Sequence, residues 1–456
     1  MKNVLDQSPF ATLAATRRLL AARKVSPGEL LSHFLARIDE RDTHIKAWRY
    51  LDRDGAKQRA AELDRQMAAI ACKPALFGIP YGAKDIFHTR GLPTEGGSKV
   101  CQGRVSTENA SVIDRLDEAG ALLLGKLTTT EFANLGTPPE TGNAWNPQHT
   151  PGGSSSGSAA ALGARMALMT LGTQTAGSLS RPAAFNGVTV LKATYGRIGK
   201  AGVIPASWSL DHVGAFTHTV EDAVLVYNTL AGPDPRDETT HTLPYTPLQL
   251  REKHDYTVGI VEHPWFDNVD EEIGVACQQA MDQLAGHGVR LRRIKLPESF
   301  DAACQAHQIV MQAECASYHR EAFLQTPTLF GDYLQEFLPQ GLAISAHEYL
   351  QAQQIRARYR AELAARFDAA DILMTPATPT LAPYSLARTG SPAFNMPFTN
   401  AGVPTLTMPV GFSRSGLPMG MQWVARHGNE QALADLGLYY QQMTDWHACL
   451  PPVCRP

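Results

Sequence analysis

Two serine- and glycine-rich segments carry the residues best suited to nucleophilic chemistry. The first reads PGGSSSGS at 151–158 and the second reads GTQTAGS at 172–178. Apolar runs lie between them, which is not typical of a flexible linker. Small residues in such a setting instead let the backbone approach a neighbour or a ligand closely. A single serine in a loop is usually a turn residue or a helix cap, so the interpretation depends on the surrounding pattern.

The wider pattern around these serines resembles the amidase signature family. It includes GIP at 78–80 followed by Lys84 and Asp85, GGSS at 152–155, GS at 177–178 with PA at 182–183, and LKATYGR at 191–197. The match covers about residues 60–225, with weaker support from Asn395, GVP at 402–404 and GMQ at 420–422. The resemblance implies the amidase signature fold and cleavage of an amide C–N bond.

The resemblance also assigns roles to individual residues. Ser178 matches the nucleophile, Ser154 matches a proton-relaying serine held with a cis peptide bond, and Lys84 matches the final base. The oxyanion hole is placed at the backbone of Thr175, Ala176, Gly177 and Ser178. The chemistry requires no cofactor. We also predict no metal, because the fifteen histidines form no H-E-x-x-H or similar cluster.

A lysine can act as the base only when it is neutral. The ordinary lysine pKa is about 10.4, and burial lowers it because desolvation disfavours the cation. Lys84 follows an apolar run, which fits a buried position. Adjacent residues of a strand point to opposite faces, so we expect Asp85 not to pair with Lys84.

Three positions near Ser178 depart from the family pattern. Gln174 and Ser180 stand where the family usually has aspartate and arginine, and Ala176 replaces a glycine. The joint loss of two charges avoids leaving one of them buried without its partner. Arg181 lies one place late, and could supply a cation by another route, face solvent or contact a substrate carboxylate.

Other arrangements of serine and histidine fit the sequence less well. GSSSG at 153–157 matches the G-x-S-x-G elbow of α/β-hydrolases with Ser155 as nucleophile, but two prolines make 146–151 a poor strand. A phosphate-binding loop lacks its lysine at Ser158. Asp211 and His212 are neighbours in sequence, cannot form a catalytic triad with each other, and are interpreted as structural.

Three functions remain open for this pattern. The first is hydrolysis of a small-molecule amide to an acid and ammonia or an amine through an acyl-Ser178 intermediate. The second is the A subunit of a glutamyl-tRNA amidotransferase, which the chain also resembles and which releases ammonia from glutamine for a partner. The third is an inert scaffold, against which the retained Lys84, Ser154 and Ser178 argue.

The elements that must position these residues alternate between helix and strand. Helical patterns cover 27–41, 55–71, 112–118, 159–167, 219–231, 271–286, 302–324 and 346–367, and strand patterns cover 76–83, 121–124, 188–191, 257–261 and 372–375. This predicts an α/β protein with a mixed central sheet covered by helices on both faces. We expect one domain over 1–456: a helical segment at 1–70, a signature core at 71–225 and the rest of the core at 226–456.

Composition narrows the partners and the compartment. Forty-one basic and forty-four acidic residues give a net charge of −3 with no basic stretch, so neither nucleic acid nor a membrane is an expected partner. Seven scattered cysteines and no signal-like N-terminus favour a cytoplasmic protein. The sequence leaves both a homodimer and association with a different partner protein open.

The substrate pocket is expected to be built from variable parts of the chain. Its walls are expected in variable segments such as 130–135 and 302–345. Candidate substrate-binding residues are Phe132, Arg181 and Ser155. Met311 and Tyr318 are further candidates for an apolar wall, although core packing is the more common role of such side chains.

Overall fold

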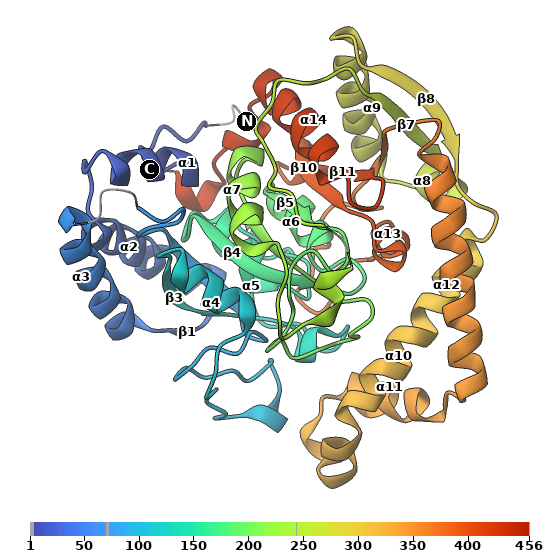
Figure 1. Ribbon diagram of the computed structural model, residues 1–456, viewed down its shortest axis with the longest axis horizontal. Helices are drawn as coiled ribbons and strands as arrows, with labels where there is room; N and C mark the ends of the chain where they lie inside the picture. Colours follow the sequence, from blue (N-terminus) through green and yellow to red (C-terminus); the bar gives the residue numbers. More distant parts are fainter. Residues whose placement is uncertain (1–3, 70–72, 243, 456) are drawn as a thin grey trace.

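An eleven-stranded mixed sheet forms the centre of the computed structural model, which describes residues 4–69, 73–242 and 244–455 (Figure 1). In sheet order the strands are β1 (Trp48–Leu51), β3 (Leu122–Leu127), β2 (Pro80–Lys84), β4 (Met169–Gln174), β6 (His212–Thr217), β5 (Thr189–Lys192), β10 (Thr405–Phe412), β11 (Pro418–Ala425), β9 (Ile372–Pro376), β7 (Thr257–Glu262) and β8 (Arg290–Lys295). This is the α/β class with a mixed sheet that the sequence predicts.

Strand direction brings two distant parts of the sequence to one sheet edge. β2 lies between β3 and β4 and is parallel to both. Ala83 is paired with Leu171, so Lys84 at the end of β2 lies near the carboxyl end of β4. β6 is antiparallel to β4, with His212 paired to Gln174. The residues just before β6 therefore meet those just after β4.

Helices cover both faces of this sheet. They are α1 (Leu13–Ala21), α2 (Pro27–Ile45), α3 (Arg53–Ala69), α4 (Ser111–Glu118), α5 (Ser156–Gly163), α6 (Ser180–Asn186), α7 (Val220–Leu230), α8 (Pro264–Asp267), α9 (Glu271–Gly286), α10 (Phe300–Gln325), α11 (Asp332–Ala343), α12 (Ala346–Arg366), α13 (Met396–Ala401) and α14 (Glu430–Met443). Figure 1 shows α10, α11 and α12 at one side of the molecule. In the described part of the chain, no helix combines the length and apolarity needed to cross a membrane.

The predicted elements are mostly present, with shifted ends. The predicted helix 27–41 continues to Ile45, and its start has the expected capping box between Ser26 and Glu29. The predicted helix 55–71 is α3, and residues 70 and 71 lie outside the described residues. The predicted helix 159–167 is wrong at its end, because α5 stops at Gly163. Ala164 caps it, and the apolar residues that follow lead into β4, since a short apolar run fits helix and strand equally.

Candidate active site

Lys84 is held at the end of β2 by two hydroxyl groups. Its Nζ lies 2.7 Å from Ser154 Oγ and 2.9 Å from Thr173 Oγ1. Thr173 belongs to β4, the parallel neighbour of β2, so the strand pairing itself sets this contact. Thr173 is absent from the residues predicted for the site, because nothing in the sequence reveals which strand lies beside β2.

Burial adjusts the protonation of Lys84. The side chain is fully buried, and this desolvation lowers its pKa from 10.5 to about 7, while the negative charge of Asp211 partly opposes the shift. Near neutral pH a large fraction of Lys84 is therefore unprotonated. A neutral amine 2.7 Å from a hydroxyl is placed to accept its proton.

Asp85 serves a different lysine, as expected from its opposite direction on the strand. Its Oδ1 lies 3.2 Å from Lys126 Nζ, and its Oδ2 accepts a hydrogen bond from the Glu95 backbone at 3.1 Å. Both side chains of the ion pair are buried. The prediction that Asp85 does not neutralise Lys84 is confirmed, which leaves the pKa of Lys84 under the control of burial.

The first serine segment turns from a loop into α5. The peptide bond between Gly153 and Ser154 is cis, as the resemblance implies. The next serine faces away: Ser155 Oγ donates to the Thr173 carbonyl at 3.2 Å and accepts from the Thr173 N–H at 3.3 Å. Ser155 is fully buried and is not among the residues that line the pocket at Ser154. Its hydroxyl therefore fixes α5 to β4.

Ser178 precedes α6 and shares a small pocket with Ser154. Its side chain is almost entirely buried, with 7% exposed. Gln174 fixes the loop around it, because Gln174 Oε1 accepts from the N–H groups of Leu179 at 2.8 Å and Ser180 at 2.9 Å. Gln174 Nε2 donates to Thr399 Oγ1 at 2.8 Å. A neutral amide thus binds the free N–H groups at the start of the helix.

The loop before Ser178 is held in place from three sides. Thr175 Oγ1 donates to Asp211 at 2.5 Å, and the Ala176 carbonyl accepts from Thr399 Oγ1 at 2.7 Å. A side chain at Gly177 would meet Asn395 Oδ1 at 2.8 Å, so this position requires glycine. Ala176 has no left-handed φ, which makes alanine acceptable where the family usually has glycine. A fixed loop of this kind can aim backbone N–H groups at one point.

Asp211 is a second residue at the site that the sequence patterns do not place there. Its other oxygen accepts from the N–H groups of Ala206 and Ser207, each at 3.0 Å. Burial raises its pKa to about 6, and these hydrogen bonds oppose the shift. The acid is therefore ionised above that pH and can hold Thr175 by a charge-assisted hydrogen bond.

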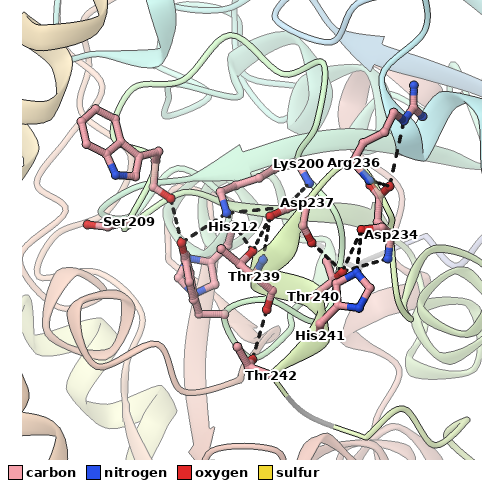
Figure 2. A network of polar contacts seen from close by, with 12 residues as sticks. Lys200, Ser209, His212, Asp234, Arg236, Asp237, Thr239, Thr240, His241 and Thr242 are labelled. Carbon is pink, nitrogen blue, oxygen red and sulfur yellow. Dashed lines mark hydrogen bonds and ion pairs between the residues drawn. The ribbon is translucent and has the colours of Figure 1, made fainter.

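A polar network fixes the segment that carries Asp211 (Figure 2). Lys200 Nζ donates to Thr239 Oγ1 at 3.0 Å and to Tyr195 Oη at 3.2 Å, and it lies 3.5 Å from Asp237 Oδ2. The Tyr195 ring meets the His212 ring edge to face. Tyr195 Oη also donates to the Trp208 carbonyl at 2.8 Å, which ties the network to the segment before Asp211. His212 is paired with Gln174 of β4 and is not among the residues that line the pocket.

Arg181 lies in the wall of the same pocket. Its guanidinium is buried, donates from Nη1 to the Gly390 carbonyl at 2.6 Å and from Nη2 to the Gly153 carbonyl, and has no acceptor for Nε. Burial lowers its pKa to about 9. Of the three roles that the sequence allows for Arg181, exposure to solvent is wrong.

The other pocket candidates separate into lining and non-lining residues. Met311 and Gln308 of α10 line the pocket, together with residues 133–135. Phe132 instead packs in the core, with its ring centroid 4.3 Å from that of His319. Tyr318 is half exposed and does not line the pocket. Phe132 and Ala133 both have left-handed φ values, 47° and 60°, so the turn that leads into this wall is strained.

Side chains able to bind a metal ion do not cluster in the described part of the chain. Within residues 4–69, 73–242 and 244–455 there is no group of three or more His, Cys, Asp or Glu side chains arranged to hold an ion.

Comparison with protein families finds the Amidase model over residues 29–434. The chain is 34% identical over 485 residues to the A subunit of glutamyl-tRNA(Gln) amidotransferase from Chloroflexus aggregans, a match that covers 98% of this chain and 99% of that protein. A protein of the same name from Roseiflexus sp. is 33% identical, covering 96% and 98%.

Solved structures share the fold over the same length. The peptide amidase of Stenotrophomonas maltophilia has a TM-score of 0.85 at 28% identity, covering 97% of this chain and 98% of that chain. A further crystal structure of an amidase has a TM-score of 0.85 at 30% identity, covering 95% and 99%.

Proposed function

The chain belongs to the Amidase family, as an enzyme that acts on C–N bonds, and we propose that it hydrolyses an amide through an acyl-Ser178 intermediate. The observation that carries this proposal is the 2.7 Å contact between buried Lys84 and Ser154, in a site where Ser154 and Ser178 line one pocket. In this proposal one proton passes from the Ser178 hydroxyl to the Ser154 hydroxyl and from there to neutral Lys84.

The proposed reaction has two halves. Ser178 Oγ forms a bond to the amide carbon while its proton passes to Ser154 and the Ser154 proton passes to Lys84 Nζ. The proton then returns through Ser154 to the amide nitrogen, the C–N bond breaks, and ammonia or an amine leaves. Water attacks the acyl-enzyme along the same path, which frees the acid and restores Ser178.

The loop at residues 175–178 is the proposed oxyanion hole. The attacked carbonyl oxygen gains negative charge, and preorganised N–H donors stabilise that charge. The contacts of Thr175 with Asp211 and of Ala176 with Thr399 support this role, because they fix the loop before substrate binds. Backbone donors held this way need no reorganisation during the reaction.

A second candidate function is that of the ammonia-releasing component of an amidotransferase. It is supported by the similarity to the A subunits of glutamyl-tRNA(Gln) amidotransferases over almost the full length. In that function the amide is glutamine, and the released ammonia passes to a partner protein. Action as a stand-alone amidase is supported by the likeness to amidases of known structure.

The test of the proposed chemistry is labelling and turnover with the purified chain. A fluorophosphonate should label wild type at Ser178, and Ser178→Ala should lose both labelling and ammonia release. Ser155→Ala should keep both labelling and ammonia release, because the Ser155 hydroxyl is hydrogen-bonded to the Thr173 backbone of β4 and does not line the pocket. Labelling that moves to Ser155, or survives in Ser178→Ala, would reject the proposal. Ammonia release from glutamine but from no other amide would favour the amidotransferase function.

A further inference from the structure

Arg181 is a buried cation without a counter-ion in the wall of the Ser178 pocket. Its side chain is 1% exposed, and its two protein acceptors are the backbone carbonyls of Gly390 and Gly153. Its Nε–H has no acceptor. Carbonyl dipoles solvate a charge but do not neutralise it, and a buried charge without an opposite partner is strongly destabilising.

No acid within the described part of the chain compensates this cation. Arg181 takes part in none of the ion pairs there, and burial is the sole cause of its lowered pKa. Its fellow lining residues are the serines, the oxyanion loop, Asn134, Gln308 and apolar side chains, with no carboxylate. The pocket therefore holds one positive charge and no negative charge.

The position of Gln174 also holds no acid that could serve as a counter-ion. Gln174 occupies the position where the family usually has an acid, and its amide oxygen is already bound by the N–H groups of Leu179 and Ser180. Ser180, at the usual arginine position, is buried with no partner for its hydroxyl. This chain therefore has an arginine one residue after the usual arginine position, and an amide at the usual acid position.

We infer that Arg181 binds a carboxylate of the substrate, so the enzyme acts on amides that carry an anionic group a few bonds from the cleaved carbonyl. The planar guanidinium and its free Nε–H suit a carboxylate. No acid lines the pocket to receive an ammonium group, so a monoamide of a dicarboxylic acid should bind better than glutamine. This inference rests on the proposed function, because Ser178 defines the pocket.

The test compares charged and uncharged amides of matched length. Ammonia release is measured from malonamate, succinamate and glutaramate, from propanamide, butanamide and pentanamide, and from glutamine. We expect kcat/KM for at least one anionic amide to exceed that of its neutral counterpart by about 100-fold. Equal values for anionic and neutral amides, or glutamine as the best substrate, would overturn the inference while leaving the acyl-Ser178 chemistry intact.

Substitutions at Arg181 test whether this residue causes the preference for anionic amides. In Arg181→Met the ratio of anionic to neutral kcat/KM should fall to within a few-fold of one, and Arg181→Lys should keep an intermediate ratio. Arg360→Met removes an exposed arginine of α12 and should keep the wild-type ratio. An unchanged ratio in Arg181→Met would overturn the inference.

A measurement on wild type covers the case in which Arg181→Met does not fold. Succinate or glutarate should slow fluorophosphonate labelling of Ser178 at concentrations where neutral butanamide does not. Failure of every dicarboxylate to protect Ser178 would overturn the inference. Failure of the fluorophosphonate to label Ser178 at all would instead reject the proposed function.

Discussion

Thr175 and Asp211 are joined by a 2.5 Å hydrogen bond that connects the loop before Ser178 to the segment before β6. The acid is buried, and its second oxygen is held by the N–H groups of Ala206 and Ser207. Both oxygens of the carboxylate are therefore used for positioning. The same negative charge raises the pKa of Lys84 against the effect of burial. One residue thus affects both the proposed oxyanion hole and the proposed base.

Asp211→Asn should change the rate and its pH dependence together. An asparagine cannot accept from Thr175 and from both backbone N–H groups in the same way, so we expect kcat to fall by about 10- to 100-fold, somewhat less than the loss of an oxyanion donor. Removing the negative charge should also lower the pKa of Lys84, which moves the acid side of the pH–rate profile to lower pH. Profiles of kcat/KM on a neutral amide measure both effects.

The control for this prediction is Asp237→Asn. Asp237 belongs to the network around Lys200 that fixes the same segment, but it makes no hydrogen bond to Thr175 (Figure 2). Asp237→Asn should lower the free energy of unfolding but should not change the pH below which kcat/KM falls. The same displacement in both variants would show that Asp211 acts through general destabilisation.

The pH dependence of the wild type should follow Lys84. A base with a pKa of about 7 is protonated below that pH and neutral above it. We therefore expect kcat/KM on a neutral amide to fall about tenfold per pH unit below pH 7 and to level off above it. Lys84→Ala should lose at least about a hundredfold, within the usual range for general base catalysis, with its greatest deficit above pH 7, where wild-type Lys84 is neutral.

Lys192 provides the matched control for that assignment. It is also fully buried, and burial lowers its pKa to about 7, but it donates to the Ala193 and Val403 carbonyls, away from Ser154. Lys192→Met should keep the acid side of the profile. If the fall in kcat/KM below pH 7 disappears in Lys192→Met, the titrating base is Lys192 and not Lys84.

The sequence predicts the reacting residues better than it predicts the residues that position them. Lys84, Ser154 and Ser178 each lie in a distinctive local pattern. Thr173 and Asp211 do not, because their roles arise from β2 lying beside β4 and β4 beside β6. Strand order in a mixed sheet is a long-range property, and the alternation of strand patterns along the chain leaves it open.

The ends of the elements show the same limit. The helix at 271–286 is predicted to the residue, since its apolar face repeats over four turns. The boundary between α5 and β4 is not, because alanine and methionine fit both structures. That missed strand carries both Thr173 and Gln174. The sequence also does not reveal that Arg181 has no counter-ion. That property depends on tertiary contacts, in which the acceptors of Arg181 are the carbonyls of Gly153 and Gly390.

Thr173→Val should show how far Lys84 depends on its second hydroxyl partner. The 2.9 Å contact from Lys84 Nζ stabilises the charged amine and fixes its direction. Its loss should lower the pKa of Lys84 further and reduce kcat by about tenfold. Thr173→Ser keeps a hydroxyl at the same place and should behave like wild type. Equal kinetics for Val and Ser variants would mean that Ser154 alone orients the lysine.

Gln174→Leu should lower stability because it removes the acceptor at the start of α6. The N–H groups of Leu179 and Ser180 would then be buried without a partner, and each such loss costs about 1–3 kcal/mol. We expect the free energy of unfolding to fall by about 2–6 kcal/mol in urea denaturation. Gln325→Leu, at the exposed end of α10, is the matched control and should change it by less than about 0.5 kcal/mol. A small effect at both positions would mean that water reaches these N–H groups, and that Gln174 is not what fixes the loop carrying Ser178.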